Sequence, residues 1–390
     1  MVGQRHGDRD GGDRGGAGSR TQTGVDTGAG ADTPESMDVI VTIQHPAHVH
    51  FFRNAIEELE HRGHDVHVFA REKDIAIDLL EAYGIDHEVI AGRASNLPGK
   101  AAIQLAYEWR LFRRARKIGP DVMMAIGEPG VVHVSAALGC RDIVFTDTEH
   151  ATYRKRFVYP MADRVCSPEF YQDDIGENHV KYPGYHELAY LHPDRFEPDP
   201  AIAEEIGLAP DEQLVVMRLV SWEAAHDIGD EGIDDIADAV ERLEAEGARV
   251  IITAEGDLPP ELEDRELSVA PERIHDLLYR ADLFVGESAT MATESAVLGT
   301  PAILVSTIEG MGNVRELRDE YGLVFSYADG RRHERAIQKA VSILDGDEDW
   351  AERRRQLLAD KIDTTNFVTA LVEDDATSVD VFRNPALPDQ

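Results

Sequence analysis

The chain has 390 residues, which is too many for one ordinary core and enough for two domains of typical size. It carries 75 acidic and 39 basic residues, a formal net charge of −36, and such a negative field repels nucleic acid and anionic membranes. The acidic residues are spread along the expected helices, which is typical of a surface adapted to high salt and argues against an acidic binding site.

From Met37 onward, apolar strands alternate with helices. The strand MDVIVTI is followed by the helix HVHFFRNAIEELEHRG, which Gly63 ends, and the alternation continues to the strand RVCSP. It pauses at YPGYHELAYLHPDRFEPDP and resumes at LVVMRLV, with LSVA as a short later strand. Strands separated by helices predict parallel sheets with helices on both faces. We expect a disordered extension at 1–36, doubly wound α/β domains at 37–190 and 211–345, a linker at 191–210, a helix at 346–367 and an acidic tail at 368–390.

Composition also bears on the cell compartment. No apolar run approaches the ~20 residues of a membrane span, and the first residues lack the apolar core of a secretory signal. We therefore expect a cytoplasmic protein. Cys140 and Cys166 lie far apart in the sequence, so we expect reduced structural thiols and neither a disulfide nor a cysteine metal site.

Ligands of open parallel sheets bind beyond the carboxyl ends of the strands, so the strand-to-helix loops are the candidate sites. None of these loops has a Walker or G-x-G-x-x-G pattern, which argues against ATPase and dehydrogenase chemistry. In GESATMATESAVLG, Ser288 and Thr290 are candidate N-caps of a helix whose first amides suit a diphosphate. Glu294 lies in the next turn, where it either accepts hydrogen bonds from a ribose diol or is an acidic residue favoured by the helix dipole.

The run ERIHDLLYRADLFVGESATMATESAVLGTPAILV resembles the donor-binding segment of GT-B glycosyltransferases. It is most similar to the N-acetylglucosaminyltransferase that makes lipid II and to the UDP-N-acetylglucosamine 2-epimerases. His48 falls on the histidine of the transferase motif GTGGH, and the spacing to the later GHDV is kept. Residues 38–345 also resemble an uncharacterised, largely archaeal glycosyltransferase-like family. The resemblance implies a GT-B-like fold of two Rossmann-like domains facing a central cleft.

The same resemblance implies roles for individual residues. The first domain would hold the acceptor and the second a nucleotide sugar, with a UDP-sugar as the first candidate. Ser288, Ala289 and Thr290 match the phosphate-facing turn, Glu294 the ribose ligand, and His48 the base that deprotonates the acceptor. No cofactor or metal is implied beyond the nucleotide sugar as substrate, since helix dipoles stabilise the leaving group. A substrate at the membrane periphery is compatible with this family.

Other loop residues have two interpretations each. Arg218 suits either a diphosphate or a structural ion pair, and Asn313 either lines the donor pocket or caps its helix. Trp222 and His226 are donor-side candidates if they are not simply packed. Asp147 and Glu149 are catalytic candidates. On the acceptor side we place His45, His150 and Glu128, the last of which we expect to be exposed at the cleft unless it is only a turn residue.

Two features of the sequence depart from these families. QHPA replaces the glycine-rich GTGG, and the epimerase motifs GTRPE and GHRREN are not reproduced. A zinc site at His45, His48 and His50 is disfavoured, because three ligands from one loop-to-helix junction require the backbone to fold tightly around the ion. We expect His50 to be structural. The sequence thus favours a glycosyltransferase, with a sugar-nucleotide epimerase or a non-catalytic nucleotide- or glycan-binding protein as alternatives.

Overall fold

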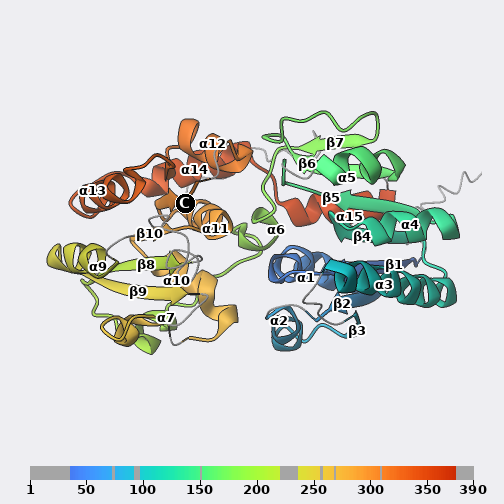
Figure 1. Cartoon of the computed structure of the whole chain (residues 1–390), viewed down its shortest axis with the longest axis horizontal. Coiled ribbons are helices and arrows are strands. Elements are labelled where there is room, and N and C mark those ends of the chain that lie inside the picture. The colour runs from blue at the N-terminus through green and yellow to red at the C-terminus, as the bar shows by residue number, and fades with distance from the viewer. Residues whose placement is uncertain are drawn as a thin grey trace, which may run out of the picture. The chain divides into compact units, whose positions relative to one another are not determined.

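The computed structural model describes residues 36–72, 75–91, 97–149, 152–219, 236–254, 258–267, 269–307 and 310–374. These residues belong to a single compact unit that contains two β-sheets (Figure 1). We term the first sheet with its helices the N half and the second sheet with its helices the C half. Every strand pair in both sheets is parallel, which confirms the predicted pair of parallel α/β domains.

The N-half sheet has seven strands in the order β3-β2-β1-β4-β5-β6-β7. The strand order reverses between β1 and β4, which makes this pair the topological switch point of the sheet. The last strand, β7, lies in a stretch where the sequence pattern predicted none. The strands are β1 (Asp38–Ile43), β2 (Asp65–Arg71), β3 (His87–Ala91), β4 (Val122–Ile126), β5 (Arg141–Phe145), β6 (Arg164–Pro168) and β7 (His179–Tyr182).

Helices cover both faces of this sheet. On one face, Val41 and Ile43 of β1 pack with Phe51 and Phe52 of α1. On the other face, Ile40 packs with residues of α3 and α4. The alternation along β1 thus sends odd and even residues into different cores, as a doubly covered parallel sheet requires. The helices are α1 (Pro46–His61), α2 (Ala76–Ala82), α3 (Leu97–Ile118), α4 (Pro129–Leu138), α5 (Thr152–Phe157) and the 3₁₀ turn η1 (Tyr159–Met161).

The C-half sheet has five strands in the order β12-β11-β10-β8-β9, with its switch point between β8 and β10. The predicted strand LSVA is not found among its described residues: Leu267, Val269 and Ala270 lie in no strand, and an isolated bridge joins the preceding Glu266 to Ile252. The strands are β8 (Gln213–Leu219), β9 (Ala248–Ala254), β10 (Leu283–Gly286), β11 (Ala302–Val305) and β12 (Val324–Tyr327). Gly286 pairs with Arg218 so closely that a Cβ on Gly286 would lie 2.7 Å from the Arg218 carbonyl oxygen. The switch point therefore requires glycine at this position.

The remaining helices cover the C half or follow the chain between the sheets. The chain segment that connects the two sheets contains α6 (Leu188–Leu191) and α7 (Ala201–Glu205). The C half carries α9 (Ile236–Ala245), η2 (Glu263–Arg265), η3 (Pro271–Arg273), α10 (Ile274–Arg280), α11 (Ala289–Leu298), α12 (Gly312–Asp319), α13 (Arg332–Leu344) and α14 (Trp350–Asp360). The predicted linker falls between the two sheets, while the domain boundaries themselves stay a prediction.

The last described helix, α15 (Thr364–Asp374), returns to the N half. Val368, Leu371 and Val372 are buried there, and Glu373 accepts from His64 of the N half at 3.1 Å. Residues 368–374 are therefore helix, and the predicted start of an acidic tail at 368 is wrong. The acidic composition of the segment concealed a run of apolar residues at helical spacing.

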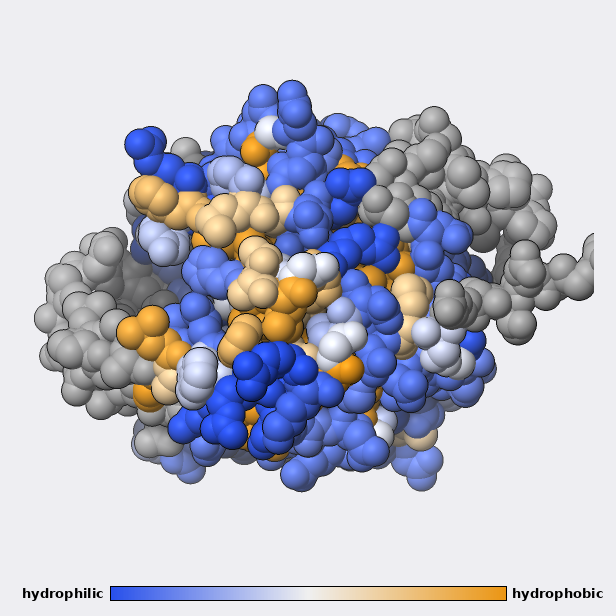
Figure 2. Space-filling view, turned by 90° about the vertical axis from the view of Figure 1, so that its right-hand side faces the viewer, coloured by the Kyte–Doolittle hydropathy of each residue, from blue (hydrophilic) through white to orange (hydrophobic). Residues whose placement is uncertain are grey.

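The surface of the N half mixes charge with apolar side chains. Figure 2 shows this side of the molecule, where hydrophilic residues surround scattered hydrophobic ones. The exposed large hydrophobic residues of the N half include Leu105 and Trp109 of α3 and Tyr153 and Phe157 of α5. Among the described helices, none combines the length and the apolar character that crossing a membrane requires.

Candidate functional site

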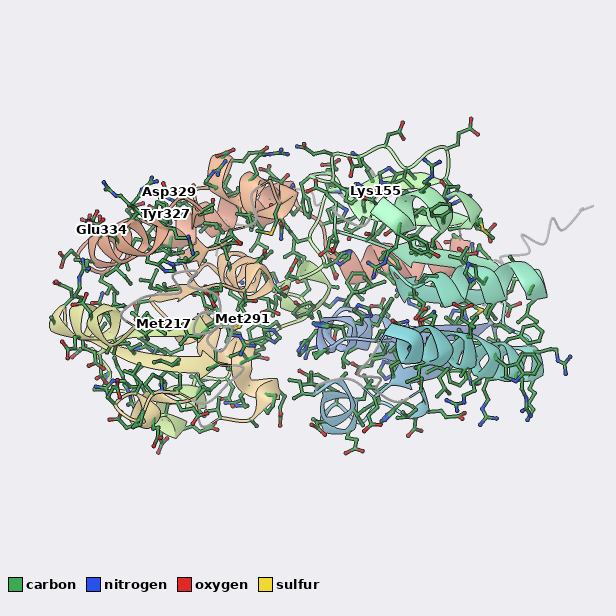
Figure 3. The ribbon with its side chains drawn as sticks, in the orientation of Figure 1. Lys155, Met217, Met291, Tyr327, Asp329 and Glu334 are labelled. Atoms are coloured by element: carbon green, nitrogen blue, oxygen red, sulfur yellow. The ribbon has the colours of Figure 1, made fainter. Side chains whose placement is uncertain are left out.

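The candidate residues lie at the carboxyl ends of the strands that form the two switch points. His45 and His48 follow β1, and Glu128 follows β4. In the C half, Arg218 lies at the end of β8 and Ser288 follows β10. Figure 3 marks Met217 in β8 and Met291 in the first turn of α11. Loops on the two strands of a switch point diverge to opposite faces of the sheet and leave room for a ligand between them.

The first loop is shorter than the sequence suggested, because α1 begins at Pro46 and not at His48. His45 is the N-cap residue, is exposed, and accepts a hydrogen bond from the Ala47 amide at Nδ1, 3.3 Å away. His48 is half-buried, and its Nδ1 accepts from the Gln44 amide at 3.4 Å. That bond places the proton of a neutral His48 ring on Nε2.

His50 is separated from this pair. Its ring is 6% exposed and lies 4.7 Å from the ring of His275 and 5.3 Å from the ring of Tyr190, centroid to centroid. Burial, and then the neighbouring His275 and Arg53, lowers the pKa of His50 well below its ordinary value. A neutral, packed imidazole is consistent with the structural role expected for His50.

On the donor side, Ser288 caps α11, since its hydroxyl oxygen accepts from the Met291 amide at 3.3 Å. Ala289 begins the helix, and Thr290 is exposed in its first turn. The first amides of an α-helix have no hydrogen-bond partner within the helix, so those at the start of α11 suit an anion. Of the two N-caps expected from the sequence, Ser288 is therefore the cap, and Thr290 lies within the helix.

Glu294 is buried, at 5% exposure, and two side chains hold it through a single oxygen. The Tyr190 hydroxyl donates to Glu294 Oε1 at 2.9 Å, and His275 Nε2 lies 3.0 Å from the same oxygen. Because a carboxylate only accepts, His275 carries its proton on Nε2 here. No described residue donates to Oε2. Burial, and then Glu294 and Glu187, raises the pKa of Tyr190 well above its ordinary value, so the tyrosine stays a donor.

Two further donor-side residues are held by neighbouring threonines. Arg218 Nη1 donates to Thr253 Oγ1 at 2.9 Å, and Asn313 Nδ2 donates to Thr293 Oγ1 at 3.0 Å. Arg218 is half-buried at the end of β8. The helix-capping alternative for Asn313 does not apply, because α12 begins at Gly312 with Met311 as its N-cap.

The two carboxylate candidates for catalysis in the N half, Glu149 and Asp147, differ in what they contact. Glu149 Oε1 accepts from the Gln172 amide at 3.1 Å and Oε2 from the Gly312 amide at 3.0 Å, at the start of α12. Both oxygens are used by backbone groups, so the catalytic role predicted for Glu149 finds no support in this geometry. Asp147 Oδ2 instead lies 3.5 Å from His186 Nδ1, which pairs an acid with a base.

The stretch that the sequence suggested only as a connection supplies several of these side chains. His186 and Glu187 are buried, as is Tyr190 in α6. Burial, and then Asp147, raises the pKa of Glu187 well above its ordinary value, while burial lowers that of His186. Titratable groups with such shifts gather at functional sites. The signal in the sequence was YHELAY, a dense run of polar and aromatic residues where the alternation of strands and helices pauses.

Glu128 does not match its expectation of an exposed turn residue. It is 2% exposed and is the N-cap of α4, where Oε1 accepts from the Gly130 amide at 3.0 Å. Burial raises the pKa of Glu128, and Arg71 lowers it in part. The turn former Pro129 is the first residue of α4, which is why the pattern G-E-P-G resembled an exposed turn. His150, Trp222 and His226 lie outside the described residues, so their predicted roles stay predictions.

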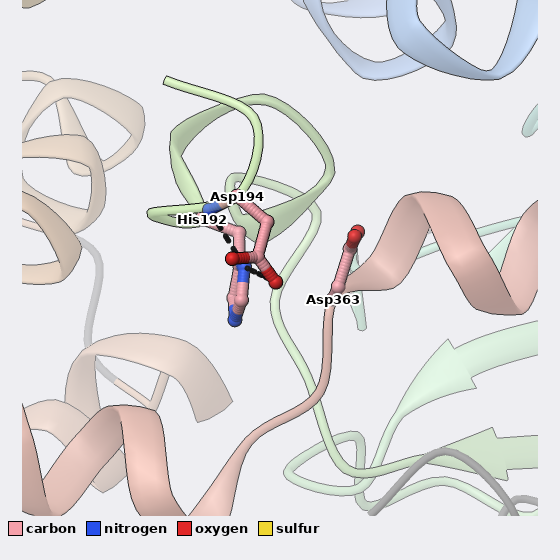
Figure 4. Close-up of side chains that lie close together, drawn as sticks. All are labelled: His192, Asp194 and Asp363. Atoms are coloured by element: carbon pink, nitrogen blue, oxygen red, sulfur yellow. Dashed lines mark hydrogen bonds and ion pairs between the residues drawn. The ribbon is translucent and has the colours of Figure 1, made fainter. Parts of the chain in front are cut away.

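One group of side chains has the spacing of a metal site. His192, Asp194 and Asp363 offer ligand atoms within 4.8 Å of one another (Figure 4). However, Arg195 Nε donates to Asp363 Oδ2 at 2.7 Å, and the Thr365 amide donates to Oδ1 at 2.8 Å. His192 Nδ1 in turn accepts from the Asp194 amide at 3.2 Å. The cluster therefore joins the start of α15 to the chain segment that connects the two sheets. The guanidinium of Arg195 already pairs with the Asp363 carboxylate that a cation would need.

Solved structures with the same arrangement identify the class. A putative UDP-N-acetylglucosamine 2-epimerase from Listeria monocytogenes superposes with a TM-score of 0.63 at 14% identity, covering 87% of this chain and 97% of that chain. CalG4, the calicheamicin glycosyltransferase, gives 0.57 at 15% identity, covering 87% and 98%. The chain therefore has the expected GT-B fold.

Residues 37–345 match the family described as "Protein of unknown function (DUF354)", and the chain belongs to that family. A relative in it is the "Uncharacterized protein MJ0665" of Methanocaldococcus jannaschii, which is 23% identical over 283 residues, or 69% of this chain and 81% of that protein. These matches confirm the resemblance found in the sequence.

Proposed function

We propose that the chain binds a nucleotide sugar, with a UDP-sugar as the first candidate, at the switch point of the C half and transfers the sugar to an acceptor held by the N half. The observation that carries this proposal is Glu294, which Tyr190 and His275 fix through Oε1. Oε2 is left for a ribose diol, in the second turn of α11, whose first amides suit a diphosphate. The named activities of the similar structures, on a UDP-sugar and in glycosyl transfer, agree with this class.

In this proposal, named residues of the chain bind the leaving diphosphate and deprotonate the acceptor. The first-turn amides of α11 and Arg218 would bind the diphosphate and stabilise its charge as it leaves. His48 is the candidate base for the acceptor hydroxyl. Since its Nδ1 accepts from the Gln44 amide, the ring has to release that bond before Nδ1 takes a proton. Base catalysis by His48 is therefore a separate element of the proposal from donor binding.

The first experiment is titration of the protein with UDP by calorimetry, in wild type and in Glu294→Gln. Glutamine keeps an oxygen for Tyr190 and His275 but loses the charge that accepts from the ribose, so we expect affinity to fall about 10–100-fold. Glu316→Gln is the matched control, because Glu316 also accepts from a buried tyrosine, Tyr185, and from Lys361 at 2.7 Å. The control should lower thermal stability and leave UDP affinity unchanged. Equal affinity of wild type and Glu294→Gln contradicts the donor site.

A sugar-nucleotide epimerase is the second candidate. It is favoured by the buried His186 and Glu187 and the half-buried Asp147, since an epimerase has to move protons on its own substrate without an acceptor. Incubation with UDP-N-acetylglucosamine alone separates the two reactions. A new epimer detected by NMR supports the epimerase, and product formed only with an acceptor supports transfer. UDP binding without either product indicates a binding protein.

A further inference from the structure

One face of the N half carries most of the large hydrophobic side chains that the described part of the chain exposes. Five of the eight such residues lie on α3, on α5 or in η1, which follows α5. Leu105 and Trp109 of α3 are 70% and 60% exposed, and Tyr153 of α5 is 65% exposed. A single exposed apolar residue needs no explanation, whereas exposed apolar residues gathered on one face of a molecule mark an interaction surface.

The helices that bear these residues cover the same face of the N-half sheet, and α4 lies between them. Val131 of α4 packs in the core that contains Leu111 of α3. Val132 packs in the core that contains Val158, directly after α5. Figure 1 shows the three helices in this order on the N half. We term the outward side of α3, α4 and α5 the basic face.

The charge of the basic face is opposite to that of the chain. The described side chains of α3, α4, α5 and η1 include eight basic residues, five in α3 and three in α5, and one acidic residue, Glu108. The chain as a whole has 75 acidic and 39 basic residues. The field of distant charges falls off within about 8 Å at physiological ionic strength, so a partner at this face meets the local charge. The net charge of −36 therefore conceals a face that attracts anions.

A cavity at the edge of the basic face gathers three arginines. Arg110, Arg113 and Arg114 line it together with residues of the edge strand β3, and its volume is about 380 Å³. Arg114 Nε donates to both carboxylate oxygens of Glu88 at 2.8 Å, so these two charges offset each other. Arg110 Nη1 donates to the Ile90 carbonyl oxygen at 2.9 Å and keeps its charge. Neither Arg110 nor Arg113 forms an ion pair with a described carboxylate, and two guanidinium groups side by side suit a phosphate.

The apolar and the charged features together select the class of partner. A small anion would use the cavity and leave the exposed aromatic residues in water. A second copy of the chain would bring like charges together across the contact. Aromatic side chains favour the boundary between water and a lipid bilayer, and arginines beside them reach the phosphates of the headgroups. A bilayer with anionic lipids therefore uses both features, and a helix that lies on its surface has no need to span it.

We propose that the basic face docks the protein on an anionic lipid bilayer, with Trp109 and Tyr153 at the level of the headgroups and Arg110 and Arg113 on lipid phosphates. Docking does not depend on the proposed sugar transfer, because none of these residues belongs to the donor or acceptor site. Each arginine near an anionic bilayer raises the affinity about fivefold, and salt weakens this contribution.

The test is co-sedimentation of the full chain with vesicles in the absence of a nucleotide sugar. Vesicles of phosphatidylcholine mixed with phosphatidylglycerol should bind the protein at least about tenfold more tightly than vesicles of phosphatidylcholine alone, and added salt should release it. Trp109→Ala should weaken binding about tenfold, and the double variant Arg110→Gln with Arg113→Gln about 25-fold. The three side chains are exposed, so the variants should keep the melting temperature of wild type. Brominated lipids should quench the fluorescence of wild type more than that of Trp109→Ala.

Matched controls place the same changes on the C half. Tyr279→Ala removes an aromatic side chain that is 43% exposed, and Arg331→Gln with Arg355→Gln removes the same charge from exposed arginines. Both controls should bind vesicles as tightly as wild type.

Three outcomes overturn the proposal. The first is equal binding to both kinds of vesicle, or equal loss in the variants and their controls. The second is a wild-type dimer that Trp109→Ala dissociates, which assigns the basic face to a second copy of the chain. The third is a folded protein that binds neither kind of vesicle, which leaves the face to a protein partner. UDP titration is a separate measurement, so the donor site can fail while docking holds, and the reverse.

Discussion

The polar side chains at the two switch points of this protein have different kinds of hydrogen-bond partner. In the C half, Glu294 has two donors on one oxygen, and Arg218 and Asn313 each donate to a threonine. In the N half the partners are backbone amides: His48 Nδ1 accepts from the Gln44 amide at 3.4 Å, and Glu128 Oε1 accepts from the Gly130 amide at 3.0 Å. A charged ligand group needs fixed partners, because reorganising them in a dry site costs free energy at each binding event.

The turns at the two switch points also differ in the reason for which each requires a glycine. After β4, Gly127 has a φ of +56° and precedes Glu128, which caps α4. At the end of β10, Gly286 lies close to Arg218, and two residues later Ser288 caps α11. One glycine is required for its own backbone conformation and the other for the closeness of a neighbouring strand. The contrast between the halves therefore begins in the backbone.

The largest effect is expected from His48→Ala, which removes the candidate base at the N-half switch point. UDP affinity should be unchanged, while turnover should fall about 10²–10⁴-fold if a sugar is transferred. Single-turnover product formation and calorimetry on the same sample measure the two quantities. Unchanged turnover removes His48 from the chemistry and leaves the donor site intact.

The two glycines provide the next test. Gly286→Ala places a Cβ 2.7 Å from the Arg218 carbonyl oxygen, a backbone atom in a sheet, so we expect a loss of about 3 kcal/mol in unfolding free energy. In Gly127→Ala the new Cβ meets only the end of the Arg154 side chain, which can move. The left-handed backbone then costs about 1–2 kcal/mol. Urea denaturation measures both, and equal losses would show that the two turns are alike.

A titration in the N half sets the conditions for stability measurements. Burial, and then Asp163, raises the pKa of Asp142 to about 6, and the Ser135 hydroxyl at 2.6 Å lowers it in part. A carboxyl whose folded pKa exceeds its unfolded value stabilises the fold at low pH and loses that contribution as pH rises from about 4 through about 6.

Asp142→Asn should remove this dependence and raise the unfolding free energy at pH 7 by up to about 3 kcal/mol. Urea unfolding at pH 5 and pH 7.5 measures it, with Asp319→Asn, an exposed carboxyl whose pKa Arg318 lowers, as the control. A slope that persists in Asp142→Asn assigns the titration to another group.

The smallest effect is expected from Tyr190→Phe, which leaves Glu294 with His275 alone on Oε1. We expect UDP affinity to fall about tenfold, because the carboxylate that meets the ribose loses one of its two positioning bonds. Affinity for 2′,3′-dideoxy-UDP should not change, since that ligand has no diol. An equal loss for both ligands would mean that Tyr190 supports the fold and not the carboxylate.

The sequence by itself determined the parallel α/β halves and the loops that carry their sites, because hydrophobic period, glycine ends and strand-to-helix junctions are local properties. It located Ser288 and Glu294 through one motif. Tertiary structure decided what these residues contact: Tyr190 reaches Glu294 across 104 positions of sequence, and Glu149 binds the Gly312 amide across 163. It also buried Glu128 and joined α15 to the N half. Partnership between distant polar groups depends on how the sheets and helices pack, and no local pattern in the sequence records it.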